Sequence, residues 1–300
     1  MFPYSLPITN TLHTPYGSIN SFVTTAVNTD QATVESFGDE WTKFNSFSAQ
    51  DIATAGAEYF DIVTPAMLNT NSTVLDVGCG TGRWSMYVAN RAKFIEAVDP
   101  SSAVVSAQQL TQAKCTNVRI TQASADAIPF ANNSFDFVFS LGVLHHIPNT
   151  QQAIIDSVSK LKPSGWFLVY LYYNLDNRGV GYKMVFYAST ILRLIINKLP
   201  ATIKLIVADC IAVAVYMPLV LLARTLVKIG WESSAKKMPL YYYVDKNFHI
   251  IRNDALDRFG TPLEQRFSKK EIETMLRNAG LSNITFSTNQ PYWHAVGQKI

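Results

Sequence analysis

The stretch VLDVGCGTGRWS at residues 74–85 decides the fold of this chain. Its first half is mostly apolar and predicts a parallel strand that is buried on both faces. Gly78, Gly80 and Gly82 then predict a sharp turn whose backbone lies close to a ligand, because no Cβ stands in the way. The helix expected after this turn points its free N–H groups and the positive end of its dipole back at it. The stretch therefore predicts a binding site for a ligand that carries an anionic group.

An acidic residue at the end of the next expected strand, in addition to Asp76 in the first, limits which ligand can bind. The segment FIEAVD at residues 94–99 predicts the next strand, with Asp99 at its end, 19 positions after Gly80. An acid at about this spacing binds a ribose diol in doubly wound folds. The third glycine comes one place too early for the dinucleotide fingerprint, so an NAD site is disfavoured. A sheet whose glycines only serve packing would leave both acids, Asp76 and Asp99, unexplained.

Strands and helices alternate along most of the chain, which predicts a doubly wound, mostly parallel sheet. A ligand then lies outside the carboxyl ends of the strands. The expected strands are residues 73–77, 94–98, 118–122, 135–140, 166–171, 284–287 and 292–297.

Five motifs, taken in order, resemble those of class I S-adenosylmethionine-dependent methyltransferases. The small-molecule branch, often called type 11, is the most similar. The resemblance covers about residues 71–172 and the tail from 261 onward. The motifs are Asp76-x-Gly78-x-Gly80-x-Gly82, Asp99-Pro100, Ala125-Asp126-x-x-Pro129-Phe130, FDFVFS at 135–140 and LKPSG at 161–165.

This resemblance implies a Rossmann-like sheet of seven strands and S-adenosyl-L-methionine as the cofactor. It implies that the glycine turn holds the methionine moiety, with Asp76 near its ammonium group. Asp99 would hold the ribose, and Asp126 would contact the adenine amino group. The cofactor-binding residues it implies are Asp76, Gly78, Cys79, Gly80, Gly82, Asp99, Pro100, Ala125, Asp126 and Leu141. The final two strands would pair antiparallel at the sheet edge.

Three segments follow from this reading. Residues 1–70 form an N-terminal arm and cap helices, and residues 71–172 with 261–300 form the methyltransferase core. Residues 173–260 form a helical lid inserted into that core.

The N-terminal segment contains an arm followed by helices. Residues 1–30 are rich in Pro, Thr, Asn and Ser without a period, and predict an extended or loosely ordered arm. Val34, Phe37, Trp41 and Phe44 then recur at helical spacing on one face. In the resembling family, helices of this kind cap the cofactor pocket. The alternative is that these aromatic residues only dock the arm onto the core.

The loop after the fourth strand carries two adjacent histidines, His145 and His146. This loop is expected to face the reacting methyl group. Imidazole titrates near neutrality and could take a proton from a hydroxyl or amine nucleophile. His145 is the better candidate for this base and His146 the better candidate for a structural role. The alternative is that both histidines only hydrogen-bond a neighbouring loop.

The insert is strongly apolar at residues 184–199 and 203–229. We expect a soluble lid over the substrate pocket, with Lys and Arg on the outer face of its helices. Contact with a membrane surface through residues 184–229 is the second interpretation. True insertion is disfavoured, because Asp209 and Pro218 interrupt the apolar run and leave it short of a span.

Four residues are candidates for contact with the acceptor: Trp41, His146, Tyr173 and Arg258. Arg258, or its neighbour Arg266, could grip a carboxylate or phosphate by a bidentate contact. The alternative is a solvated connection with weak surface ion pairs.

Composition excludes several classes of protein. The net charge of +3 is small, and no Asn-Pro-Pro-aromatic run follows the fourth strand, so a nucleic-acid substrate is disfavoured. The charge is uneven, at −6 for residues 1–70 and +5 for residues 174–230. Three scattered cysteines fit neither a disulfide framework nor a zinc site, so no metal is expected. The first residues lack a signal-peptide pattern, and we expect a cytoplasmic protein, with membrane-peripheral placement as the variant.

The leading hypothesis is therefore methyl transfer to a small-molecule acceptor, at oxygen or carbon of an apolar, sugar or lipid-linked compound. The second hypothesis is a non-catalytic S-adenosylmethionine-binding or membrane-peripheral interaction protein. The sequence names neither the acceptor nor the oligomeric state.

Overall fold

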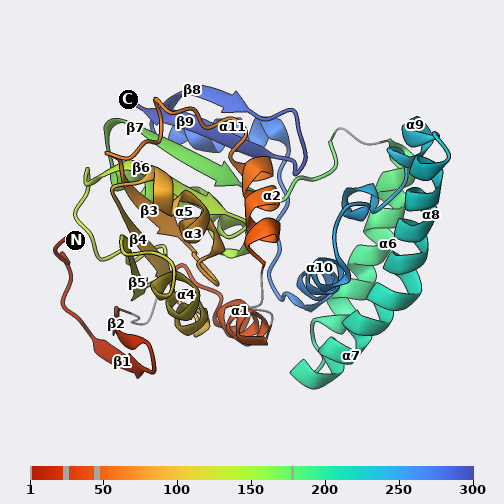
Figure 1. The fold of residues 1–300 in the computed structure, drawn as a ribbon, viewed down its shortest axis with the longest axis horizontal. Helices are drawn as coiled ribbons and strands as arrows, with labels where there is room; N and C mark the ends of the chain where they lie inside the picture. Colours follow the sequence, from red (N-terminus) through yellow and green to blue (C-terminus); the bar gives the residue numbers. More distant parts are fainter. Residues whose placement is uncertain (1, 23–26, 44–47, 177–178) are drawn as a thin grey trace. The chain divides into compact units, whose positions relative to one another are not determined.

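The computed structural model describes residues 2–22, 27–43, 48–176 and 179–300. The chain divides into two compact units (Figure 1). The first, which we call the core unit, comprises Met1–Asp176 and Leu263–Ile300. The second, the helical unit, comprises Asn177–Pro262.

A nine-stranded sheet forms the centre of the core unit, in the order β1-β2-β5-β4-β3-β6-β7-β9-β8. The strands from β5 to β7 in this order are parallel, and β9 and β8 close the edge antiparallel. This confirms the predicted doubly wound, mostly parallel sheet. The strands are β3 (Thr73–Val77), β4 (Phe94–Asp99), β5 (Val118–Gln122), β6 (Phe135–Leu141), β7 (Leu161–Tyr170), β8 (Leu281–Phe286) and β9 (His294–Lys299).

The N-terminal arm is not simply extended, which corrects the prediction for residues 1–30. It contains an antiparallel hairpin of β1 (Asn10–Thr14) and β2 (Gly17–Ser21). Ser21 pairs in parallel with Gln122 at the end of β5, so the sheet has nine strands rather than seven. Ile19 is fully buried there, next to Ile120 and Ala97 in one apolar cluster. The sequence pattern of these short polar strands does not predict their pairing, because the partner strand β5 lies about a hundred residues later in the chain.

Strand β7 begins earlier than predicted, at Leu161 rather than Trp166. Phe135 pairs with Leu161 and Phe137 pairs with Trp166, so the turn-like residues between them form a bulge within the strand.

Helices cover both faces of the sheet (Figure 1). α1 ends at Lys43, and Phe44, the last member of the predicted apolar stripe, lies outside the described residues. The helices of the core unit are α1 (Gln31–Lys43), α2 (Ala49–Tyr59), α3 (Arg83–Val88), α4 (Ala103–Gln112), α5 (Thr150–Ser159) and α11 (Lys269–Asn278), with short 3₁₀ turns η1 (Ala89–Arg91) and η2 (Leu144–His146).

The apolar core lies on both sides of β6. Phe135, Phe137 and Phe139 are fully buried on this central strand, as expected for a strand covered on both faces. Since β3, β4 and β6 are neighbours and parallel, their carboxyl ends meet at one edge of the sheet. The predicted motifs follow these ends.

The helical unit is built from long apolar helices packed on α10 (Phe248–Gly260). Ile196, Tyr216 and Val220 meet Ile251 and Phe259 of α10 in its buried cluster. The other elements are α6 (Val180–Ile196), α7 (Ala201–Ile211), a π-helical turn η3 (Ala212–Tyr216), α8 (Met217–Lys228), α9 (Glu232–Ala235) and a 3₁₀ turn η4 (Tyr241–Tyr243).

The sequence interpretation of the apolar run was wrong in two respects. First, α7, η3 and α8 continue as one helix, of which Thr202–Lys228 is long and apolar enough to cross a membrane by length and composition alone. Pro218 follows the π-helical turn, where the wider coil accommodates the ring that would otherwise meet the preceding turn. Second, Arg193 and Arg224 do not lie on the outer face but bond to backbone within the unit.

Candidate active site

The glycine turn follows β3 and is held against β4. Gly78 N–H and Cys79 N–H both donate to Val98 O, at 2.8 and 3.0 Å. Gly78 has a φ of +80°, and a Cβ placed on it would lie 2.4 Å from the Val143 side chain. Only glycine fits this position. The turn is thereby packed directly against the loop that carries the two histidines.

Asp76 lies beneath this turn and is 1% exposed. Ser85 Oγ donates to Asp76 Oδ2 at 2.7 Å, whereas Oδ1 has no hydrogen-bond partner among the described residues. Burial raises the pKa of Asp76 to about 7, and the nearby charge of Asp99 adds to this effect. A buried carboxylate with a free oxygen favours a cationic partner. The methionine ammonium group of S-adenosylmethionine is such a cation, so Asp76 fits the predicted role.

Asp99 closes the other side of the turn at the end of β4. Its Oδ2 accepts from Gly80 N–H at 2.9 Å. Its Oδ1 accepts from both N–H and Oγ of Ser101, at 2.9 and 2.6 Å. A carboxylate offers about four acceptor positions. One ribose hydroxyl can therefore join this set, and a second would replace the Ser101 hydroxyl.

Asp126 is already engaged from two directions. Ser124 Oγ donates to its Oδ1, and Asn28 N–H donates to its Oδ2 at 2.9 Å. Asn28 is itself clamped to Asn149 by two backbone–side-chain hydrogen bonds, of 2.9 and 2.8 Å. A residue of the predicted arm, Asn28, thus reaches the predicted adenine end of the site. Sequence reasoning missed Asn28, because a lone asparagine in a polar arm carries no signal.

Helix α1 lies across the turn. Trp41 is the nearest side chain to the Cβ position of Gly80, at 3.6 Å. The guanidinium of Arg83 stacks 4.8 Å from the Trp41 ring, and Phe37 meets the edge of His146 at 4.8 Å. The structure therefore places Trp41 beside the cofactor turn, and Phe37 beside the histidine loop. These contacts are compatible with the predicted cap, whose covering of a cofactor stays a prediction.

The histidine pair sits on η2, just after β6. His145 is fully buried, with its ring 4.0 Å from that of His146 and 3.9 Å from that of Tyr172. Burial, and to a lesser degree the charges of His146 and Arg266, hold the pKa of His145 well below its usual 6.5. Neither ring nitrogen has a hydrogen-bond partner among the described residues. His145 is thus a neutral imidazole able to accept one proton.

His146 is fixed by the segment that returns from the helical unit. Its Nδ1 lies 2.7 Å from Leu263 O, and a carbonyl only accepts, so Nδ1 carries the hydrogen. Leu263 N–H in turn donates to Thr33 Oγ1 on α1 at 3.1 Å. The two histidines therefore have different surroundings, with His146 anchored and His145 held only by packing.

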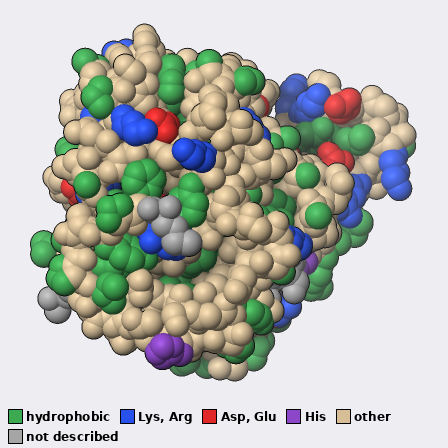
Figure 2. All heavy atoms as spheres, turned by 60° about the vertical axis from the view of Figure 1, so that its left-hand side comes forward, with side chains coloured by type: hydrophobic (Ala, Val, Ile, Leu, Met, Phe, Trp, Pro, Cys, Tyr) green, Lys and Arg blue, Asp and Glu red, His purple; other side chains and the backbone are tan. Residues whose placement is uncertain are grey.

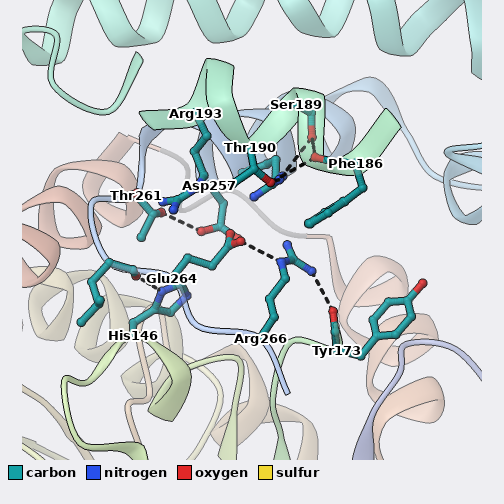
Figure 3. Close-up of polar contacts among 12 residues, drawn as sticks. His146, Tyr173, Phe186, Ser189, Thr190, Arg193, Asp257, Thr261, Glu264 and Arg266 are labelled. Atoms are coloured by element: carbon teal, nitrogen blue, oxygen red, sulfur yellow. Dashed lines mark hydrogen bonds and ion pairs between the residues drawn. The ribbon is translucent and has the colours of Figure 1, made fainter. Parts of the chain in front are cut away.

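The other predicted acceptor contacts are Tyr173 and Arg258. The Tyr173 ring packs on Tyr292 and Trp293, while its carbonyl accepts from Arg266 at 3.3 Å (Figure 3). Arg266 also pairs with Glu264 at 2.8 Å, and its contact with an anionic group of the acceptor stays a prediction. Arg258 belongs to the helical unit, where it donates to Thr190 Oγ1 at 2.8 Å. The other predicted cofactor residues lie at the ends of the strands. Cys79 lies in the turn after β3, Pro100 follows β4, Ala125 lies just beyond β5, and Leu141 ends β6.

Comparison with known proteins agrees with this geometry. The family described as "Methyltransferase domain" matches residues 75–169. Phosphoethanolamine N-methyltransferase 2 of Caenorhabditis elegans is 32% identical over 103 residues, which are 33% of this chain and 24% of that protein. Ubiquinone biosynthesis O-methyltransferase of Albidiferax ferrireducens is 26% identical over 162 residues, 51% of this chain and 63% of that protein.

A solved structure, the complex of a methyltransferase activator with a methyltransferase from Haloferax volcanii, matches with a TM-score of 0.50. It is 12% identical, with 88% of this chain and 97% of that chain covered. This likeness concerns the fold alone.

Residues 75–169 are a class I S-adenosylmethionine-dependent methyltransferase domain of the small-molecule kind, and its cofactor is S-adenosylmethionine. The match covers less than two thirds of the length of either curated relative.

Proposed function

We propose that this chain transfers a methyl group from S-adenosylmethionine to the hydroxyl oxygen of a small, apolar, phenol-like acceptor. One observation carries the proposal. His145, buried and neutral, follows the carboxyl end of β6 with both ring nitrogens unpartnered among the described residues. The ubiquinone O-methyltransferase likeness supports the same class of acceptor.

The cofactor supplies an electrophilic methyl group on a sulfonium. Asp76 would bind the ammonium group of the cofactor, and Asp99 would bind its ribose. The glycine turn would let the methionine moiety lie close to the backbone. The acceptor oxygen would bond to the methyl carbon as the carbon–sulfur bond breaks toward sulfur. The acceptor proton would pass to a nitrogen of His145.

The environment of His145 restricts the acceptor. A histidine whose pKa lies well below 6.5 is a weak base. Such a base suits a hydroxyl that is already acidic, as in a phenol, better than an aliphatic alcohol. The rings of Tyr172 and Tyr170, whose centroids lie 5.7 Å apart, supply aromatic surface beside it. These features favour a flat, aromatic acceptor.

The test has two measurements on the full chain. Calorimetry with S-adenosylhomocysteine establishes the cofactor site, and labelled methyl transfer is then measured to a phenol, an aliphatic alcohol and phosphoethanolamine. We expect turnover with the phenol. His145→Gln should lower kcat by roughly 10²-fold or more and leave S-adenosylhomocysteine binding intact.

His13→Gln is the matched control, because His13 lies exposed on the β1 strand. Methylation of phosphoethanolamine alone, or full activity in His145→Gln, would contradict the proposal. Cofactor binding without turnover on any acceptor would instead favour a non-catalytic role.

A further inference from the structure

Exposed apolar side chains are concentrated in the helical unit. Of the 21 large hydrophobic residues that are exposed in the described chain, 17 lie between Val180 and Phe248. Soluble monomers rarely expose a large continuous apolar surface unless it is an interaction site. On α6 these residues form a stripe at helical spacing: Val180, Met184, Tyr187, Ile191 and Ile195. We call this stripe, with the exposed large apolar residues of α7, η3 and α8, the outer face. Its further members are Ile203, Ile206, Val213, Val215, Leu221 and Leu222.

Three charged side chains of these helices bond within the unit, whereas Lys198 and Lys228 are exposed. Arg193 of α6 is 6% exposed and donates to Thr261 O at 3.0 Å (Figure 3). Asp209 of α7 pairs with Arg252 of α10, whose Nη2 lies 2.7 Å from Asp209 Oδ2. Arg224 of α8 donates to Val244 O and Lys246 O, at 2.8 and 2.7 Å.

Two neutral polar residues of α6 also bond within the unit. Ser189 and Thr190 lie on the inner side of α6, where Arg258 donates to their hydroxyls at 3.2 and 2.8 Å (Figure 3). The helices are thus polar inside and apolar outside, the reverse of a helix that faces water. This arrangement is typical of helices whose outer face meets hydrocarbon.

The net charge of the helical unit indicates which kind of apolar environment fits the outer face. Residues 177–262 contain 12 Lys and Arg against 5 Asp and Glu, a net charge of +7. The rest of the chain contains 13 against 17, a net charge of −4. Lys198 and Lys228 are exposed at the ends of α6 and α8, and Trp231 is exposed just beyond. Figure 2 shows Lys and Arg side chains beside hydrophobic ones on the helical unit, at the right of the view. Basic and aromatic residues at helix ends are typical of a lipid headgroup boundary.

We propose that the outer face of α6, α7 and α8 docks into one leaflet of an anionic lipid bilayer, with the helices lying in the membrane plane. Although Thr202–Lys228 is long enough to span, α10 is packed along α6 and α7 and carries Arg252, Asp254, Asp257 and Arg258. A spanning arrangement would draw these charges into hydrocarbon, which is costly for each. In-plane docking buries the outer face and leaves α10 in water.

The experiment is flotation of the full chain with vesicles of phosphatidylcholine alone or of phosphatidylcholine mixed with phosphatidylglycerol. No cofactor or acceptor is added, so the result is independent of the proposed methyl transfer. We expect binding to the anionic vesicles to exceed binding to the neutral ones by at least about tenfold, and to weaken at high salt. Alkaline carbonate should release the bound protein.

The variant Met184→Glu/Ile191→Glu/Ile195→Glu should lose binding by more than about tenfold, since it places charge in the apolar stripe. The matched control is Leu6→Glu/Ile8→Glu, which changes exposed apolar residues of the core unit and should bind like the parent. Circular dichroism verifies that both variants are folded.

Three results would overturn the proposal. One is failure of the folded parent to bind anionic vesicles. Another is resistance to carbonate, which indicates a spanning helix. The third is a concentration-dependent dimer that the triple variant abolishes, with no vesicle binding, because the outer face would then be an interface between copies of this chain.

Discussion

The two units of this chain place their charges in opposite ways. In the core unit, apolar strands fill the interior, and acids such as Asp99 and Asp126 gather at one edge of the sheet. In the helical unit, Arg193 and Arg224 bond to backbone within the unit and Asp209 pairs with Arg252, while many apolar side chains are exposed. Composition alone does not reveal this difference, because both units are rich in apolar residues. What distinguishes the units is where the apolar side chains lie. Those of the core unit are mostly buried, whereas many of those in the helical unit are exposed.

The largest expected contrast concerns two apolar residues of similar chemistry. Phe137→Ala empties part of a fully buried core and should lower the free energy of unfolding by about 3–5 kcal/mol. Ile191→Ala removes a side chain that is 63% exposed and should change it by less than about 0.5 kcal/mol. Urea denaturation of each variant, followed through the unfolding transition of the unit that carries the substitution, measures both changes in free energy. An equally large loss for Ile191→Ala would mean that the outer face is covered in solution.

Glycine substitutions should have opposite signs in the two units. Gly78→Ala forces a Cβ into Val143 at a φ of +80°, and should cost roughly 2 kcal/mol or more. Gly181→Ala in α6 meets no atom within 4 Å and should stabilise the helix by roughly 0.5–1 kcal/mol. Thermal unfolding and S-adenosylhomocysteine calorimetry together test this pair. Tight binding by a stable Gly78→Ala variant would refute the role given to the turn.

Asp76 should make cofactor binding depend on pH. Its pKa is raised from 3.8 to about 7, so below pH 7 the folded chain holds a proton that the ammonium group must displace. The affinity for S-adenosylhomocysteine should therefore rise by up to about tenfold per pH unit until about pH 7, and then level off.

The same shift acts on stability in the opposite direction. Because the folded pKa is the higher one, the folded chain binds the proton more tightly than the unfolded chain. The free energy of unfolding of the ligand-free chain should thus fall as pH rises from about 4 to about 7. Asp76→Asn should flatten both profiles, and an unchanged binding profile in this variant would exclude Asp76 as the ammonium partner.

The smallest effect is expected at the Asp209–Arg252 pair. Both side chains are 38% exposed, so in water Asp209→Asn should cost no more than about 1 kcal/mol. With anionic vesicles present the loss should stay about the same, since in-plane docking leaves α10, and with it this pair, in water. Denaturation with and without vesicles measures the difference. A clearly larger loss with vesicles would place this pair against the lipid and would contradict in-plane docking.

Much of the core unit follows from its sequence, since local patterns carry it. Apolar runs ending at Asp76 and Asp99, and glycines that tolerate positive φ, define the strands and the turn without help from distant residues. The hairpin at β1 and β2 was missed because its joining pair, Ser21 and Gln122, depends on a sheet edge that only the fold creates. Asn28 was missed for the same reason, as its partner Asp126 lies far along the chain.

The directions of the basic side chains in the helical unit were predicted only in part, since Lys198 and Lys228 are exposed but Arg193 and Arg224 bond to backbone within the unit. Lys and Arg were expected outside, because a helix in water places them there. The ion pair of Asp209 requires Arg252, which comes more than forty residues later on α10. The continuity of the helix through Pro218 likewise depends on a π-helical turn that no residue pattern announces.

The point at which the chain leaves and re-enters the core unit has an evolutionary meaning. Phe267 N–H donates to Tyr172 O at 2.8 Å, and Asn174 N–H donates to Phe267 O at 3.0 Å, so the outgoing and returning segments are paired. A segment whose two ends are already joined can be gained, lost or exchanged with little loop-closure entropy. The methyltransferase sheet could thus acquire a new location in the cell, or a new set of acceptors, by replacing one cassette while its catalytic edge is inherited unchanged.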